Sequence, residues 1–360
     1  MPLLFKRLML GALLVFSLTV AATMLRLALE WRQALADIDS MIVTPAAIDL
    51  PTEPSTYAMS QPTGSVASDQ APTAQPAVAV PLGVEATPTL SQASLNILLL
   101  GTDARPGDDA ARTDAMVLVR IERDSGRVSM LSIPRDLWVT YPTGGDGRVN
   151  AAYSVGELRF GPGGGAALAK STVSRLLDVK VDNFVLINFQ GFQTLIDQLG
   201  GITVDVPEAI YDPAYPTADY KTIEVRFHAG IQTLSGEQAL IYARTRHADS
   251  DFGRNQRQQL VLMAIFNRVR ERGLLQQLTS FDDYTGAMRG YVQTDLARSR
   301  MIEVAGFARS IQADDVLRYA IDSEAIVALR APATFAAEPT ALKRIVRQFS
   351  GAAVSTAGGK

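Results

Sequence analysis

The chain has 360 residues, of which 47% are apolar and 20% charged, a balance typical of globular proteins. Its formal net charge of −3 argues against a protein that coats nucleic acid, because such binding depends on many contacts between basic side chains and phosphates. The absence of cysteine excludes disulfides, cysteine-ligated zinc and thiol catalysis.

An apolar run of 18 residues without a charge, 8–25, follows Lys6 and Arg7. This length is about the minimum for a transmembrane helix. The basic pair favours a cytoplasmic N-terminus and an extracytoplasmic position for the rest of the chain. We therefore expect residues 1–29 to be a cytoplasmic N-terminus and a membrane anchor. The alternative is a cleaved signal peptide, since an Ala-Leu-Ala sequence lies at 34–36, and both interpretations export the folded region.

Residues 30–94 are expected to form a disordered tether. From residue 43 onward this segment is rich in Pro, Ala, Ser and Thr and has no apolar periodicity. Such a tether would space the folded domain away from the membrane surface.

The next predicted elements have the pattern of an α/β domain at 95–272. The apolar run at its start predicts a buried strand that leads into a polar loop, and two β-rich runs around 123–127 predict a hairpin. Further along the chain we expect a helix after the Gly-rich turn at 161–165, a strand at 183–190, and a helix that ends at Gly200–Gly201 before another strand. A strand at 239–246 and a long amphipathic helix capped by Asp251 complete the segment.

These elements predict a mixed central β-sheet, with antiparallel and parallel pairs, flanked by helices. Residues 273–350, with a helical pattern at 294–311 and an apolar strand at 325–332, are expected to extend the same domain. Residues 351–360 are expected to be a frayed tail.

Four arginines lie close together between residues 239 and 260. On a strand, Arg244 and Arg246 would project from the same face, about 7 Å apart. In the following helix, Arg254 shares one side with Arg257 and Gln258. Planar guanidinium groups match phosphate oxygens, and several that converge suit more charge than one phosphate carries. The cluster therefore predicts a diphosphate site. The alternative is a solvated helix face whose arginines pair with Asp249 and Asp251.

Two aspartates earlier in the chain supply a possible cation site. Asp103 follows the first strand, and Asp114 lies near Arg112. Carboxylates near a diphosphate repel it unless a cation lies between them, and Mg²⁺ commonly shares its ligands with phosphates in this way. Either aspartate alone is equally well explained as a turn or cap residue. Arg135, next to Asp136, and Arg148 add further positive charge.

The segment 164–171 nearly matches a phosphate-binding P-loop, but Ala169 replaces its second glycine. We interpret Lys170 as a residue of a helix surface. His228 and His247 have no metal-ligand spacing.

Seven motifs in order resemble the LytR–CpsA–Psr family. Between residues 95 and 272 they read NILLLGTDAR, ARTDAMVLVRI, LSIPRDLWV, RVNAAYSVG, NFVLINFQGFQTLIDQLGGITVDVP, LSGEQALIYARTRH and DFGRNQRQQ. The anchor and tether are also similar to the usual layout of this family.

The resemblance implies a single-pass enzyme of the cytoplasmic membrane whose C-terminal domain is extracytoplasmic. Such an enzyme moves a glycopolymer from a polyprenyl-pyrophosphate carrier to peptidoglycan, with Mg²⁺. By the same resemblance Asp103 and Asp114 are the metal-associated pair, and with Arg112 and Arg244 they form the catalytic set. The implied pyrophosphate-binding residues are Arg112, Arg135, Arg148, Arg244, Arg246, Arg254 and Gln258. The lipid requires an apolar channel, for which 184–192 and the helix after it are candidate walls, although core packing is the better explanation for most of these side chains.

Three other functions are considered. A polyprenyl-pyrophosphate phosphatase would use the same site with water as acceptor. A nucleic-acid-binding transcriptional attenuator is disfavoured by the export signal, the acidic charge and the lack of a helix-turn-helix. A non-catalytic envelope-binding module is disfavoured by the two aspartates.

Overall fold

The computed structural model describes residues 26, 29–30, 32–48, 94–103, 112–217, 221–246, 251–273, 286–312, 315–329 and 334–351. Within these ranges, each helix is too short or too polar to cross a bilayer. The expected anchor at 8–25 lies outside them, as does the frayed tail apart from Gly351.

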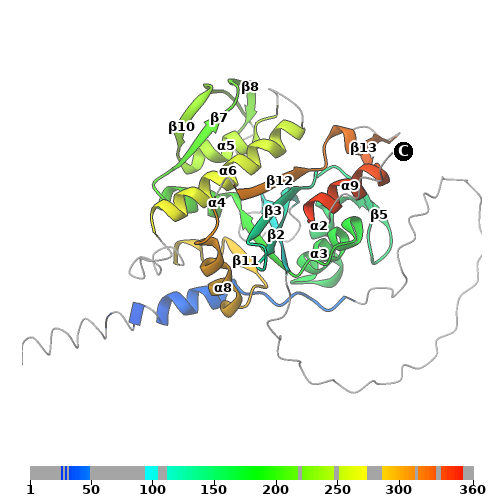
Figure 1. Cartoon of the computed structure of the whole chain (residues 1–360), viewed down its shortest axis with the longest axis horizontal. Helices are drawn as coiled ribbons and strands as arrows, with labels where there is room; N and C mark the ends of the chain where they lie inside the picture. Colours follow the sequence, from blue (N-terminus) through cyan, green and yellow to red (C-terminus); the bar gives the residue numbers. More distant parts are fainter. Residues whose placement is uncertain are drawn as a thin grey trace, which may run out of the picture.

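A mixed six-stranded sheet forms the centre of the molecule (Figure 1), in the order β11-β6-β1-β2-β3-β12. β1 is parallel to β6 and β3 is parallel to β12, whereas the other neighbours are antiparallel. This arrangement confirms the predicted α/β fold with a mixed sheet flanked by helices. The strands are β1 (Ser94–Thr102), β2 (Thr113–Glu122), β3 (Arg127–Ser132), β6 (Asn183–Asn188), β11 (Val292–Thr294) and β12 (Val316–Ala320).

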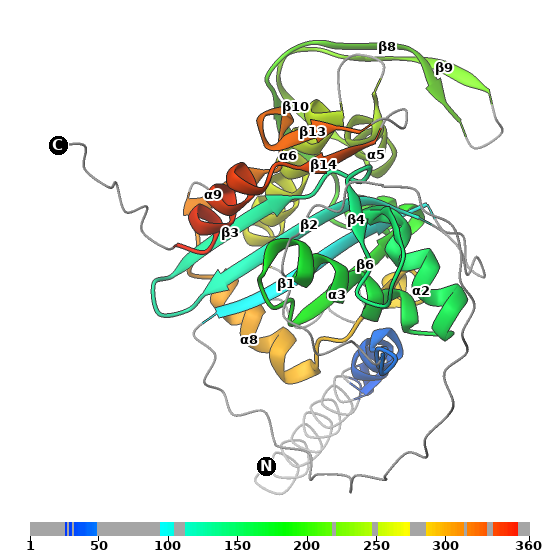
Figure 2. The same cartoon turned by 90° about the vertical axis from the view of Figure 1, so that its right-hand side faces the viewer.

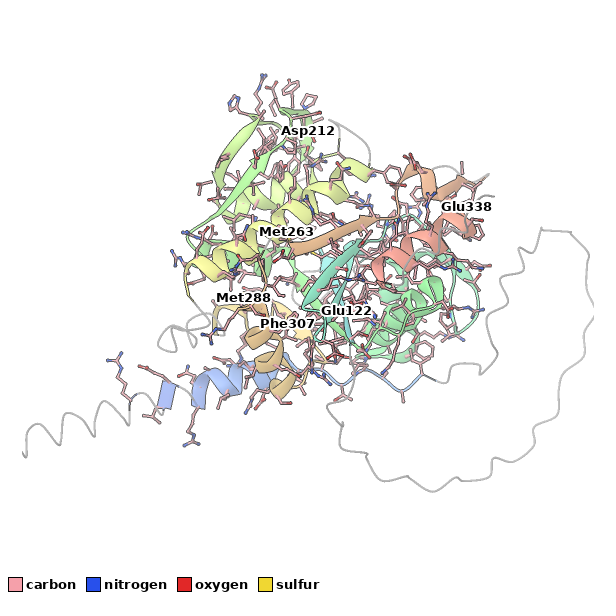
Figure 3. All side chains as sticks on the ribbon, viewed as in Figure 1. Glu122, Asp212, Met263, Met288, Phe307 and Glu338 are labelled. Carbon is pink, nitrogen blue, oxygen red and sulfur yellow. The ribbon has the colours of Figure 1, made fainter. Side chains whose placement is uncertain are left out.

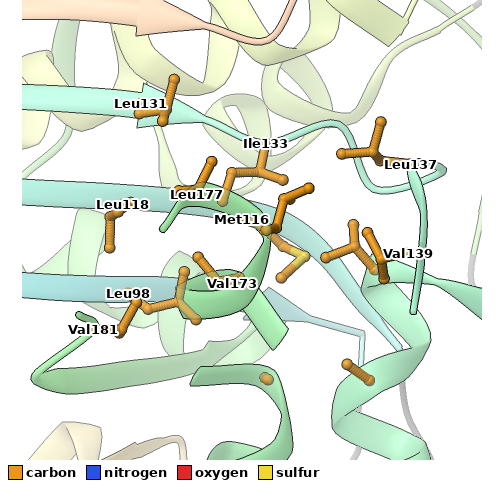
Figure 4. Close-up of a cluster of buried hydrophobic side chains, with 14 of the residues drawn as sticks. Leu98, Met116, Leu118, Leu131, Ile133, Leu137, Val139, Val173, Leu177 and Val181 are labelled. Carbon is orange, nitrogen blue, oxygen red and sulfur yellow. The ribbon is translucent and has the colours of Figure 1, made fainter. Parts of the chain in front are cut away.

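Helices cover both faces of this sheet because side chains alternate along each strand. Leu98 and Leu100 of β1 enter the main core (Figure 4), which α2 (Ala152–Phe160), α3 (Gly164–Leu177) and α9 (Pro339–Phe349) complete. Leu95 and Ile97 point the other way and pack with α8 (Arg298–Ala308).

A second lobe has its own apolar core, built around Ile196, Val204 and Tyr242. In it β7 pairs with β10, and β8 pairs with β9 in a hairpin that extends from the body of the molecule (Figure 2). Its elements are α4 (Phe189–Gln198), β7 (Ile202–Val206), β8 (Ile210–Pro216), β9 (Thr222–Phe227), β10 (Gly230–Leu234), α5 (Gly236–Arg244) and α6 (Asp251–Glu271).

Short elements lie between β3 and α2 and between β12 and α9. They are β4 (Trp138–Thr140), β5 (Asp146–Arg148), the 3₁₀ turns η1 (Val149–Ala151) and η4 (Ser323–Ala325), β13 (Ile326–Ala328) and β14 (Phe335–Ala337).

The predicted strand at 239–246 is wrong, because residues 236–244 form helix α5. Ser235 and Gln238 make a capping box: the Ser235 hydroxyl accepts from the Gln238 backbone N–H, and the Gln238 side chain accepts from the Ser235 N–H. The strand predicted at 183–190 likewise ends at Asn188, where α4 begins. Asp251 is the first residue of α6, and the position before it lies outside the described ranges.

Residues 32–48 also differ from the expectation of a disordered tether. Residues 32–41 are helical, and Val43 N–H donates to the Thr294 carbonyl at 2.7 Å. Residues 49–93 lie outside the described ranges.

The interpretation of Lys170 as a surface residue of its helix is wrong as well. Its ammonium group donates to Asp295 at 2.5 Å and to the Asp182 carbonyl at 2.7 Å, and its side chain is 17% exposed. Lys170 thus attaches the segment after β11 to the central sheet and helix α3.

Candidate functional site

The strand register brings Asp103, Arg112 and Asp114 to one end of the sheet. Thr102 of β1 pairs with Thr113 of β2, so Asp103 and Arg112 are the next residues beyond that pair. The preceding pair is Gly101 with Ala115, which leaves Asp114 as the extra residue of a β-bulge. A bulge redirects a side chain and is common beside active sites.

The same end of the sheet includes the start of α4. Thr102 is also in register with Asn188 of the parallel strand β6, so Asp103 and Phe189 follow matched positions. Neighbouring strands are about 4.8 Å apart, which places these two residues side by side at the carboxyl ends of β1 and β6. Ligands of open α/β sheets commonly bind at this edge.

Arg135 and Arg148 are held beside this edge by aspartates. Arg135 Nη1 donates to Asp114 Oδ1, and its Nε lies 3.4 Å from Asp136 Oδ2. Arg148 Nη1 lies 3.3 Å from Asp136 Oδ1. Because Asp136 is buried and contacts both guanidiniums, it holds the two positive groups together, and one of them, Arg135, also contacts Asp114.

Arg244, the last residue of α5, lies close to two aromatic rings. Its guanidinium carbon is 4.3 Å from the centre of the Phe189 ring and 5.7 Å from that of Tyr215, and Nη1 donates to the Tyr215 hydroxyl at 3.0 Å. Burial raises the pKa of Tyr215, although the charge of Arg244 acts against that rise. Since Phe189 adjoins Asp103, the contact between Arg244 and the Phe189 ring brings Arg244 to the end of the sheet where Asp103 and Asp114 lie.

Two side chains of α6 fix the end of α5. Arg257 donates from Nε to the Tyr242 carbonyl at 3.1 Å and from Nη2 to the Thr245 carbonyl at 2.6 Å, and it is buried. Gln258 reaches the Ala243 carbonyl at 3.5 Å. These contacts satisfy carbonyls that a helix C-terminus leaves without partners. Arg257 therefore supports the backbone around Arg244.

Arg246 and Arg254 flank the loop between α5 and α6. Arg246 is exposed and follows Thr245, whose hydroxyl donates to the buried Asp212. Arg254 is buried in the first turns of α6. Gln259, five residues later, donates to Ser132 at the end of β3 at 2.8 Å, so Arg254 lies within about 8 Å of that contact along the helix axis.

Asp103 and Asp114 are suited to Mg²⁺ only as part of a larger ligand set. The described residues contain no group of three or more His, Cys, Asp or Glu side chains that could hold a metal ion. Mg²⁺ is commonly bound by one or two carboxylates together with substrate phosphates and water. The aspartate pair thus fits a metal that arrives with a phosphate ligand.

The expected wall of a lipid channel is mostly core. Phe184 and Leu186 are buried in the main core, and Phe192 packs against the core of the second lobe. A cavity of about 730 Å³ lies between the end of α6 and α8, where Arg270 and Arg309 are among its lining residues. None of the predicted site residues lines it.

Three contributors to this geometry were not predicted. Asp136 was noted only beside Arg135, and neither Tyr215 nor Asp212 was singled out. The roles of Tyr215 and Asp212 depend on contacts between residues 29 and 33 positions apart in the chain, Arg244 with Tyr215 and Thr245 with Asp212, for which no local pattern exists.

Comparison with known families gives one match over most of the chain. The LytR_cpsA_psr family matches residues 57–348. This range includes the predicted catalytic domain and nearly all of the predicted extension.

Two curated relatives are polyisoprenyl-teichoic acid–peptidoglycan teichoic acid transferases. TagU of Oceanobacillus iheyensis is 36% identical over 210 residues, which cover 58% of this chain and 61% of that protein. TagT of Bacillus subtilis is 34% identical over 224 residues, which cover 61% of this chain and 65% of that protein. The chain thus spans just under two thirds of the length of these relatives.

Solved structures agree with this relationship. The structure of TagV from B. subtilis has a TM-score of 0.57 and 26% identity, over 73% of this chain and 98% of that one. A structure titled TagT bound to LI-WTA has a TM-score of 0.55 and 29% identity, over 72% of this chain and 90% of that one.

Proposed function

The chain belongs to the LytR–CpsA–Psr family, and from this premise we propose that it is a membrane-anchored extracytoplasmic phosphotransferase. Its donor is a glycopolymer on a polyprenyl-pyrophosphate carrier, and its acceptor is peptidoglycan. The named activity of the TagT and TagU relatives supports this proposal, with a teichoic acid as their glycopolymer.

One observation carries the proposal: a single edge of the sheet combines two aspartates with fixed arginines. Asp103 and Asp114 lie there beside Arg135 and Arg244, and the two arginines are held by Asp114, Asp136 and Tyr215. This arrangement suits transfer of a phosphoryl group, because charge develops on phosphate oxygens that positioned guanidiniums stabilise.

In the proposed reaction, an acceptor hydroxyl attacks the phosphorus that is bonded to the sugar. The bond from this phosphorus to the bridging oxygen breaks, polyprenyl phosphate leaves, and a phosphodiester forms. The acceptor proton passes to a base, for which Asp103 and Asp114 are the two candidates. Arg112 and Arg246, both exposed near this edge, are assigned to the outer phosphate oxygens, with Arg148, Arg254 and Gln258 as further members of the set.

Mg²⁺ is proposed as the cofactor, with Asp103 and Asp114 as its protein ligands. When bound it would neutralise charge on the phosphate oxygens. Arg135 contacts Oδ1 of Asp114, so this arginine orients the carboxylate that would meet the metal.

The proposal is tested with the full-length protein, a polyprenyl-pyrophosphate-linked oligosaccharide, Mg²⁺ and peptidoglycan fragments, followed by mass spectrometry of lipid and glycan. Wild type should yield glycan linked to the acceptor through a phosphodiester. Asp114→Ala and Arg244→Ala should each lower the rate by roughly 10²-fold or more. Asp124→Ala in the β2–β3 turn and Arg226→Ala on β9, both exposed, are the matched controls and should retain activity.

Other products identify the alternatives. Polyprenyl phosphate together with glycan phosphate that is not linked to the acceptor would indicate a phosphatase. Bound but unchanged lipid would indicate a binding module and refute the proposed enzyme.

A further inference from the structure

Residues 32–48 form a segment, here called the docked segment, that packs on the folded domain. Its helical part buries Ala34, Asp37, Ile38 and Met41, whose exposed fractions are 2%, 6%, 7% and 8%. These positions follow the i, i+3, i+4, i+7 spacing of one helix face. The helix thus presents a complete inner face to the domain.

Polar contacts attach the same helix to the region around α8. Arg298 pairs with Asp39 and donates from Nη2 to the Leu35 carbonyl at 3.3 Å. Arg289 lies 3.6 Å from Asp37. Figure 1 shows this helix (blue) alongside α8 (orange). Both apolar and ionic contacts therefore specify the position of the docked segment.

The rest of the docked segment continues the edge of the central sheet. Ile42 makes a parallel bridge with Thr294 of β11, and Ala46 N–H donates to the Gly163 carbonyl at 3.2 Å. Ile48 packs against the main core. The segment therefore contacts the domain from α8 to the start of α3.

This placement changes the role of the 45 residues from 49 to 93. They join Ile48 to Ser94, and both of these residues belong to the same folded body. A linker between two points of one body does not set the distance from that body to anything before residue 32.

We propose that the docked segment holds the α8 side of the domain against the membrane, and that residues 49–93 are not the spacer. This inference rests on the anchor at 8–25 in the proposed function. Six residues, 26–31, separate that anchor from the docked helix, and they span at most about 20 Å. A flexible tether over 26–93 would instead give a mean separation of roughly 45 Å. A fixed, short separation suits an enzyme whose donor is bound to a membrane lipid.

The test measures the distance from the domain to the bilayer in the full-length chain, reconstituted in nanodiscs that contain lipids with acceptor dyes on their headgroups. Because the chain has no cysteine, a single introduced cysteine is the one site that a thiol-reactive donor dye labels. Ile302→Cys on α8 and Ile231→Cys on β10 are suitable, since these side chains are 68% and 78% exposed. The elements that carry them, α8 and β10, lie far apart in both views (Figures 1 and 2). Energy transfer should be high from position 302 and low from position 231.

Two further variants distinguish the effect of the docked segment from the effect of residues 49–93. Deletion of residues 55–84 should leave the transfer from position 302 unchanged. The double variant Ile38→Asp with Met41→Asp should release the helix, lower this transfer about twofold or more, and increase amide hydrogen exchange over 32–48. The matched control, Gln33→Asp with Ala36→Asp, changes the exposed face of the same helix and should behave like wild type.

Milder and inactive variants keep the result interpretable. Arg298→Gln removes the ion pair with Asp39 but no apolar contact, and it should lower the energy transfer less than the double variant does. It replaces the double variant in the test if that variant does not fold. Asp114→Asn should give wild-type transfer efficiencies, so a failure of the proposed chemistry is distinguished from a failure of docking.

Once the chain is assembled in nanodiscs, two results would overturn the inference. One is a change in transfer from position 302 on deletion of 55–84 alone, and the other is wild-type transfer in the double variant. A wild-type chain that does not assemble into nanodiscs would remove the anchor and this inference with it.

Discussion

Tyr215 connects Arg244 to the β8–β9 hairpin. Its hydroxyl accepts a hydrogen bond from Arg244, and Asp212 on the same strand accepts from Thr245, the residue that follows Arg244. Burial raises the pKa of Tyr215 above its usual value near 10, so the phenol stays neutral as pH rises through that value. The hairpin therefore orients Arg244 with a neutral group over the working pH range.

Tyr215→Phe tests this orienting role. The ring remains, and only the hydrogen bond to Arg244 is lost, which costs about 1 kcal/mol, or roughly fivefold. Because Arg244 is proposed to act on charge in the transition state, we expect kcat to fall by this factor while KM and Tm change little. Tyr211→Phe, on the exposed part of the same strand, is the control. A loss of Tm with unchanged kcat would show that Tyr215 has only a packing role.

At the scale of the element, helix α5 shows which part of the site was predictable. The site residues were assigned from the motifs and stay a prediction, whereas the strand assigned to 239–246, which placed Arg244 and Arg246 on one face, is wrong. Ser235, three residues before Gln238, was the overlooked signal, since this spacing marks a helix start. The bulge at Asp114 and the contacts of Asp136 have no local signal, because they depend on the pairing of β1 with β2 and on the approach of Arg148.

Glu122 (labelled in Figure 3) is the last residue of β2 and pairs with Arg127, the first residue of β3. Its carboxylate lies 3.3 Å from Arg127 Nε, and this ion pair should make the stability of the hairpin depend on pH. Burial alone would raise the pKa of Glu122, but the hydrogen bond from Arg120 and the charge of Arg127 outweigh it, so the net pKa is lowered. A carboxylate with a lowered pKa stabilises the fold above its unfolded value of 4.5. That stabilisation is lost as pH falls through the folded pKa.

We therefore expect Glu122→Gln to destabilise the protein by up to about 1 kcal/mol at pH 7, and by much less near pH 3. Urea unfolding at both pH values measures the difference. Asp124→Asn, in the adjoining exposed turn, is the control and should show little effect at either pH. An equal loss of stability at both pH values would mean that Glu122 stabilises the hairpin through its packing and not through its charge.

At the scale of the whole molecule, apolar alternation and glycine positions were enough to predict the fold class and the β2–β3 hairpin. They could not predict how distant segments attach, because that depends on single tertiary contacts. The docked segment attaches through Arg298 and Asp39, which are far apart in the chain. The predicted boundaries between anchor, tether, domain and extension remain predictions, although residues 32–48 are not tether.

Lys170 is the clearest of these long-range attachments. Asp295, which follows β11, accepts from Lys170 and also from Phe184 N–H at 2.7 Å, and the Asp295 side chain is 9% exposed. One carboxylate thus joins α3 and β6 to the C-terminal extension. The extension should therefore unfold together with the sheet, as one cooperative unit.

Lys170→Met keeps the apolar stem but leaves the Asp295 carboxylate without its cation, and we expect a loss of roughly 1.5–3 kcal/mol in the free energy of unfolding. The control is Lys180→Met, because Lys180 pairs with Asp182 but its side chain is 71% exposed, so its loss should be within about 0.5 kcal/mol. Asp295→Asn combined with Lys170→Met should cost less than the sum of the two single changes. Equal effects of the two lysine variants, or strict additivity in the cycle, would mean that Lys170 and Asp295 do not join the extension to the sheet.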